Sequence, residues 1–172
     1  MSHPTSNTLN TSLITLIDSA LLDAVSAEAR SHPRLRKNRN FHHSDDAPGH
    51  RLLNAIEPGS YIAPHRHLDP HKDETMLVLR GQLGLVVFDE NGAVLQVVHL
   101  APDATSGGIA QGVDIPHGCW HTVLALESAT VFCEAKAGPY VPLTNDERAC
   151  WAPPEGDPAA SGYLEKLRAL FA

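Results

Sequence analysis

Between Arg51 and Lys136 the chain carries short apolar runs separated by glycine and proline. An Asn91-Gly92 step between two such runs is typical of a tight hairpin. Many short strands at this spacing favour an all-β sandwich or barrel over alternating strands and helices. The runs predict strands over 52–56, 61–67, 75–79, 83–88, 94–100, 113–115, 121–126 and 130–136.

The periodicity changes at both ends of this region. Apolar positions three and four apart predict a helix over 18–30, with Asp18 or Ser19 as its cap. A short terminal helix should follow Asp157-Pro158, with one apolar face made of Tyr163, Leu164, Leu167 and Phe171. We expect residues 1–172 to form one domain: a helical extension over 13–32, a β-barrel over 50–140 and a tail over 141–172.

Composition and charge narrow the class of protein. Thirteen Lys and Arg stand against 20 Asp and Glu, and this acidic balance argues against a nucleic-acid partner. No run approaches the ~20 apolar residues of a membrane span. The three cysteines form no CxxC pair, which indicates reduced thiols and a cytoplasmic protein.

Histidine is frequent, with 11 residues, and four positions suggest a metal site. Residues two apart on a strand face the same side, so His65 and His67 would present two imidazoles together. Glu74 begins the next predicted strand and can return beside them, while His121 begins a later one. Three imidazoles and a carboxylate suit a divalent transition metal such as Zn, Fe, Mn or Ni.

The spacing of these residues resembles the cupin family. Gly59, five residues, His65 and His67, then Glu74, six residues and Gly81 follow its first motif, with a gap of six before Glu74 in place of three or four. The run Pro116-His117-Gly118-Cys119-Trp120-His121 follows the end of its second motif. The resemblance implies a jelly-roll barrel, the cupin double-stranded β-helix, with His65, His67, Glu74 and His121 as ligands. His71, inside the longer gap, is an alternative to Glu74.

A closer resemblance, to the WbuC-type cupin-fold metalloproteins, extends over most of the chain. It rests on the Arg34 to His42 segment, the two histidine runs, Lys136-Ala137-Gly138-Pro139-Tyr140 and Trp151-Ala152-Pro153. It implies a bacterial protein linked to cell-surface polysaccharide (O-antigen) gene clusters, without a settled reaction. Residues that match its pattern and are implied to line the cavity are Arg51, Glu134, Lys136 and Tyr140.

Other residues suggest how a ligand would be held. Alternation places Tyr61 on the face of His65, where it could move protons together with Glu74 as a catalytic pair. The basic run of Arg34, Arg36, Lys37 and Arg39 predicts a clamp for a phosphate or carboxylate. The alternative is a solvated loop after a helix.

Three functions fit this sequence. The first is a small metalloenzyme, an isomerase or epimerase, that acts on an anionic sugar or sugar-phosphate derivative. The others are an Fe(II)-dependent dioxygenase and a non-catalytic, metal-anchored sugar-binding module. Outward-facing apolar residues also predict a homodimer or cover by the terminal helices: Leu77, Leu79, Leu124 and Leu126.

Overall fold

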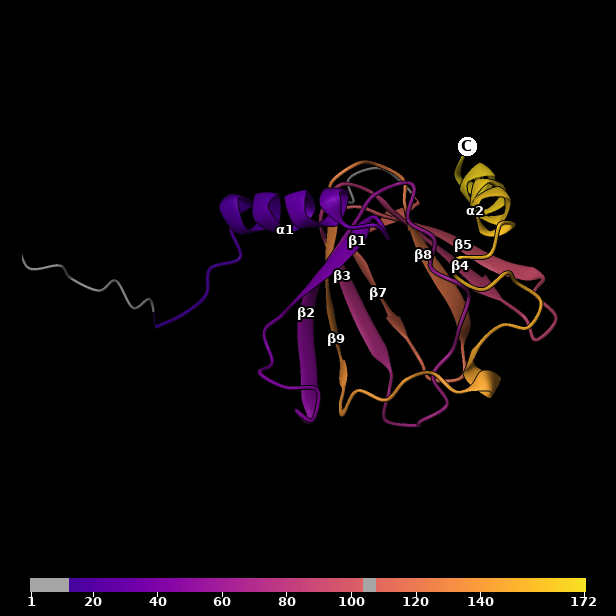
Figure 1. Cartoon of the computed structure of the whole chain (residues 1–172), viewed down its shortest axis with the longest axis horizontal. Helices are drawn as coiled ribbons and strands as arrows, with labels where there is room; N and C mark the ends of the chain where they lie inside the picture. The colour runs from indigo at the N-terminus through magenta and orange to yellow at the C-terminus, as the bar shows by residue number, and fades with distance from the viewer. Residues whose placement is uncertain (1–12, 104–107) are drawn as a thin grey trace, which may run out of the picture.

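Two β-sheets pack against each other and enclose the interior of the molecule (Figure 1). The structure, a computed structural model, describes residues 13–103 and 108–172. One sheet has the strand order β1-β2-β9-β3-β7, and the other has the order β6-β5-β4-β8. The strands are β1 (Arg36–Asn40), β2 (Gly49–Ile56), β3 (Glu74–Arg80), β4 (Leu83–Phe88), β5 (Val94–Leu100), β6 (Ile109–Ala110), β7 (Gly112–Ile115), β8 (Trp120–Ala125) and β9 (Thr130–Ala137).

Side chains that alternate along the strands fill the space between the sheets. Met76 follows Glu74 on the inner face of β3, and Val123 follows His121 on the inner face of β8. The alternation therefore directs the side chains of Glu74 and His121 into an apolar interior. The buried members of this inner core are Ile56, Met76, Val78, Leu83, Leu85, Leu100, Ile115, Val123, Ala125 and Phe132.

Helices cover the outer faces of both sheets. Helix α1 (Ser19–Ser31) begins at Asp18, whose carboxylate accepts a hydrogen bond from Leu21 N. Its buried face packs on Leu53 and Val131 of the five-stranded sheet. Helix α2 (Ala160–Arg168), continued by a 3₁₀ turn (Ala169–Phe171), packs on the other sheet. Figure 1 shows the two helices on opposite sides of the barrel.

The helices cover three of the four leucines that the sequence predicts to face outward. Leu79 packs in the cluster beneath α1, while Leu124 and Leu126 pack in the cluster beneath α2. Leu77 is 51% exposed. The sequence left open a homodimer interface or cover by the helices. Cover by the helices explains three of the four leucines.

The extended segment over 61–67 was predicted as a strand, and this prediction was wrong. Its regular pairing is limited to a bridge at His65, which meets His121 on one side and Arg148 on the other. Pro64 interrupts any continuous ladder because it has no backbone N–H. Part of the basic run, by contrast, forms strand β1 against β2 rather than a loop. Helix α2 also begins at Ala160, later than Pro158.

None of the helices in residues 13–103 and 108–172 is long and apolar enough to cross a membrane.

Candidate metal centre

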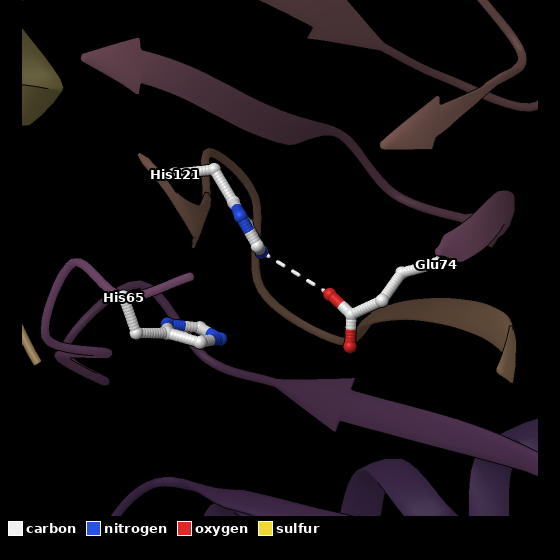
Figure 2. Close-up of side chains that lie close together, drawn as sticks. All are labelled: His65, Glu74 and His121. Atoms are coloured by element: carbon white, nitrogen blue, oxygen red, sulfur yellow. Dashed lines mark ion pairs between the residues drawn. The ribbon is translucent and has the colours of Figure 1, made fainter. Parts of the chain in front are cut away.

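Three side chains from distant parts of the chain converge between the sheets (Figure 2). Glu74 is the first residue of β3, His121 lies in β8, and His65 lies in the extended segment over 61–67. Two backbone hydrogen bonds join the histidines directly: His65 N to His121 O at 3.0 Å and His121 N to His65 O at 2.9 Å. The bridge therefore fixes their rings side by side, with centroids 4.6 Å apart.

Backbone carbonyls set the tautomer of both rings. His65 Nδ1 lies 3.1 Å from Ala63 O, and His121 Nδ1 lies 3.0 Å from Cys119 O. A carbonyl oxygen can only accept, so each Nδ1 must donate its hydrogen. Each Nε2 then keeps its lone pair, which is the form that binds a metal.

The two carboxylate oxygens of Glu74 have different surroundings. Oε1 accepts from Lys136 Nζ at 2.7 Å and from His67 Nε2 at 3.0 Å. Oε2 lies 3.2 Å from His121 Nε2. Both Oε2 and His121 Nε2 are buried without a hydrogen-bond partner among the described residues. A cation between Glu74 Oε2 and His121 Nε2 would give both buried atoms the polar partner that they lack.

These donors fit a divalent transition metal. One ligand atom from each of His65, Glu74 and His121 lies within 4.8 Å of the others. Two imidazole nitrogens and a carboxylate oxygen suit Zn, Fe, Mn or Ni better than Mg or Ca. The three residues would hold the ion through two Nε2 atoms and Glu74 Oε2.

His67 and His71, the other candidates from the sequence, occupy different places. His67 Nε2 donates to Glu74 Oε1, so in this arrangement it orients the carboxylate, and its role as a fourth ligand stays a prediction. His71 lies exposed in the turn before β3 and is not part of the converging group. The structure thus favours Glu74 over His71 at this site.

Electrostatics keep His65 and Glu74 in the protonation states that a metal needs. Burial lowers the pKa of His65 to about 3, so its imidazole is neutral at pH 7. Burial raises the pKa of Glu74, but His121, His67 and the charge of Lys136 outweigh it and hold that pKa below its usual range. The site therefore offers a neutral imidazole at His65 and an ionised carboxylate at Glu74.

The metal-free protein should lose stability as the pH falls from about 6.5 towards 3. In this window the unfolded chain binds a proton at His65 that the folded chain does not. The free energy of unfolding therefore decreases as the pH is lowered. In urea unfolding with chelator present, the pH slope of wild type should exceed that of His65→Gln by up to about 1.4 kcal/mol per pH unit. Equal slopes for the two proteins would contradict the depressed pKa.

The segment over 144–149 forms hydrogen bonds to residues 64–68, with which no regular strand of the described residues pairs on that side. Arg66 N donates to Glu147 O at 3.0 Å, and Ala149 N donates to Pro64 O at 3.2 Å. The Glu147 carboxylate accepts from Leu68 N and from Thr144 N, both at 2.9 Å. The sequence predicted only a tail here, because no local pattern shows a distant backbone partner.

Glu147→Gln should weaken metal binding without removing a ligand. The neutral amide loses the charge-assisted hydrogen bond from Leu68 N, just after the histidine run, and the one from Thr144 N within its own segment. We expect an affinity loss of about 10-fold, as for residues that orient metal ligands, measured by competition with a chelating dye. Asp146→Asn is the matched control, since Asp146 contacts Arg66 through its backbone oxygen. Equal affinities in the two variants would refute a positioning role for Glu147.

A cavity of about 480 Å³ opens onto the metal centre. Its inner wall is apolar and includes Ile62, Met76 and Phe132. On one side, Lys136 Nζ lies 2.7 Å from both Glu74 Oε1 and Glu134 Oε1. Burial lowers the pKa of Lys136, but the two carboxylates outweigh it and hold that pKa above its usual value. A permanent ammonium therefore lies beside the ligand carboxylate.

The structure brings some predicted binding residues to this cavity and leaves others outside. Lys37, Glu134, Lys136 and Tyr140 line it, as does Arg34. Arg36 also lines it, but its guanidinium already binds Glu155, Ser60 Oγ and Tyr61 O.

Arg39 and Arg51 are exposed and do not line the cavity. Arg51 precedes Leu53, which packs beneath α1 on the outer face, and the two share that face by alternation.

Tyr61 lies apart from the converging donors. It packs with the residues of α2, and its hydroxyl donates to Pro153 O at 2.7 Å. The expectation that Tyr61 shares the face of His65 assumed a regular strand, and the 61–67 segment is not one. Its catalytic role stays a prediction that this geometry does not support.

Sequence reasoning missed Asn54 in the cavity wall. Asn54 Nδ2 donates to Glu134 Oε2 at 2.6 Å and so completes the polar group around Lys136. Alternation in β2 could have found it, because Asn54 lies between Leu52 and Ile56, which also line the cavity.

A family model described as a domain of unknown function, DUF6016, matches residues 17–100. No curated protein matches the chain. The solved structure of KdgF from Halomonas sp. is similar, with 16% identity and a TM-score of 0.47 over 64% of this chain and 85% of that one.

Two further solved structures are similar to the chain. A protein from Shewanella oneidensis has 18% identity and a TM-score of 0.49 over 67% of this chain and 73% of its own. A cupin superfamily protein from Desulfitobacterium hafniense has 11% identity and a TM-score of 0.46 over 66% of this chain and 86% of its own. The described residues of this chain form two facing sheets with a candidate His–Glu–His metal centre between them.

Proposed function

We propose that this protein is a small metalloenzyme that binds one divalent transition metal and isomerises or epimerises an anionic sugar derivative. The observation that carries the proposal is a pair of buried atoms without a hydrogen-bond partner among the described residues. These atoms are Glu74 Oε2 and His121 Nε2, which lie 3.2 Å apart beside a cavity. The cavity volume falls in the range of small-molecule sites. The cationic side chains of Arg34 and Lys37 in its lining favour a phosphate or carboxylate on the ligand.

The polar residues of the cavity have separate tasks in this proposal. A bound metal would act as a Lewis acid that polarises a carbonyl or hydroxyl of the substrate. Lys136, held between two carboxylates, donates a hydrogen bond to a substrate oxygen. Glu134, fixed by Asn54 Nδ2, offers a carboxylate that takes and returns a proton. The apolar wall limits the access of water to these groups.

The cellular setting belongs to the same proposal. The resemblance to WbuC-type proteins supports a role in bacterial cell-surface polysaccharide metabolism. All three cysteines are free thiols, which supports a reducing compartment such as the cytoplasm.

The reaction class can be tested on the metal-loaded protein. Proton NMR should show conversion or solvent-deuterium exchange of a hexose phosphate at equal rates in air and under strict anaerobiosis. Glu134→Gln should lose the exchange and keep the metal, because Glu134 is not among the converging donors. Turnover that requires oxygen would favour the dioxygenase. Thermal stabilisation by the sugar phosphate without any exchange would favour a binding module.

We also propose a homodimer, because Leu77 stays half exposed on a sheet whose other outward leucines, Leu53 and Leu79, are covered. Light scattering at micromolar concentration should then give twice the 18.5 kDa mass of the chain. A monomer mass would overturn this proposal.

A further inference from the structure

A second, larger chamber adjoins the metal cavity. Its volume is about 740 Å³, against about 480 Å³ for the metal cavity. The two share four lining residues: Arg34, Ile62, His65 and Tyr140. Each volume alone falls in the range of a small-ligand site, so the two together exceed what one monosaccharide fills. The proposed sugar substrate accounts for only the inner chamber.

Arg34 lies at the junction of the two chambers and carries an unengaged charge. Its backbone N and O bond to His32 and Ser60, while its guanidinium makes no hydrogen bond or ion pair with other described residues. Arg36, two residues later, has its guanidinium fully engaged by Glu155 and Tyr61 O. Arg34 also lines a smaller pocket beside α2. An anion held there would have open space on both sides.

The walls of the outer chamber suit a less polar group than the inner one does. Pro64, Leu143, Ala149 and Pro154 supply apolar surface. Asn145, Arg148 and Glu155 supply polar atoms, and the Glu155 carboxylate is already bound to the Arg36 guanidinium. The inner chamber instead holds Glu74, Glu134 and Lys136 beside the candidate metal donors. A ligand that spans both chambers would place its sugar at the metal and a second, flatter or more apolar group outside.

We infer that the ligand is a sugar joined through a phosphodiester or pyrophosphate to a second group, with its bridging phosphate at Arg34 and that group in the outer chamber. This inference rests on the proposed function. A phosphomonoester would end at Arg34 and leave the outer chamber filled with water. A bridging phosphate continues in both directions and buries its second substituent. The guanidinium provides paired donors for the phosphate oxygens.

The test compares two probes on the metal-loaded protein by calorimetry. The probes are glucose 1-phosphate, a monoester, and uridine diphosphate glucose, which adds a second group beyond its phosphates. We expect the second probe to bind at least about 10-fold more tightly, because it buries additional surface in the outer chamber. Equal affinities, or binding of neither probe at millimolar concentration, would overturn the extended ligand.

Variants separate the junction from the outer chamber. Arg34→Gln should weaken both probes about 10-fold or more, because both keep a phosphate at the junction. Lys166→Gln, an exposed cation on α2, is its control and should change neither. Cys150→Trp fills the outer chamber and should remove the advantage of the larger probe alone, whereas Cys150→Ser should keep it. An advantage that survives Cys150→Trp would place the second group elsewhere.

Metal content keeps the two proposals apart. Protein that binds stoichiometric metal and the monoester, but gains nothing from the second group, contradicts the extended ligand and leaves the metalloenzyme intact. Protein that binds no metal contradicts the proposed function itself. The metal is therefore measured on each sample before either probe is added.

Discussion

Replacing His65 and His121 together by alanine is expected to remove stoichiometric metal from the purified protein. The two rings supply both unengaged Nε2 atoms of the cluster, and Glu74 Oε2 alone cannot retain the ion. Residues that only orient ligands cost about 10- to 100-fold in metal affinity, so the loss of two ligands should exceed this. Mass spectrometry of untagged protein measures the content directly.

Two single variants complete this experiment. His71→Ala should keep the wild-type metal content, because His71 is exposed in the turn and outside the converging group. His67→Ala should lower the affinity less than the double variant does if His67 acts through Glu74. Stoichiometric metal in the double variant would show that the ion binds elsewhere. Wild-type protein without metal would contradict the site itself.

The second large effect is expected from Lys136→Met in the metal-free protein. The ammonium is the close cationic partner of both Glu74 and Glu134, and each carboxylate is buried. Removing one member of a buried ionic group leaves uncompensated charge and costs about 3 kcal/mol. For a chain of this size the melting temperature should fall by roughly 6–12 °C, as followed by circular dichroism.

Metal and a second substitution should each reverse part of this loss. A divalent ion at Glu74 Oε2 supplies positive charge in place of the ammonium, so the variant should be less destabilised when loaded. Lys136→Met with Glu134→Gln removes one of the two carboxylates and should recover stability in the metal-free state. A melting temperature of Lys136→Met equal to wild type, with or without metal, would refute a structural role for the ion pair.

Local patterns in the sequence determined most of the strands. Alternation with period two alone puts Met76 on the face of Glu74 and Val123 on the face of His121, and in the structure both are buried in the inner core. The hairpin at Asn91-Gly92 also forms, with Gly92 at a positive φ of 85°. Such features depend on the preferences of neighbouring residues alone, and a sequence displays these directly.

The same reasoning failed where distant segments set the conformation. The 61–67 segment has the composition of a strand, yet it is held by His121 and by the tail over 144–149 instead of a regular neighbour. Tyr61 consequently turns toward α2 and away from the metal donors. No local pattern could show this, because the partners are remote in the sequence.

Sequence patterns alone predicted the all-β class, the two terminal helices, and His65, Glu74 and His121 as candidate donors. The folded chain was needed to show which oxygen of Glu74 lacks a hydrogen-bond partner in the described part of the chain and where the second chamber lies. It also shows that the Arg34 guanidinium has no partner among the described residues. This difference arises from the distance along the chain over which each kind of interaction acts. Periodicity and motif spacing record interactions within a segment, whereas ion pairing and cavity shape depend on side chains that only the folded chain brings together.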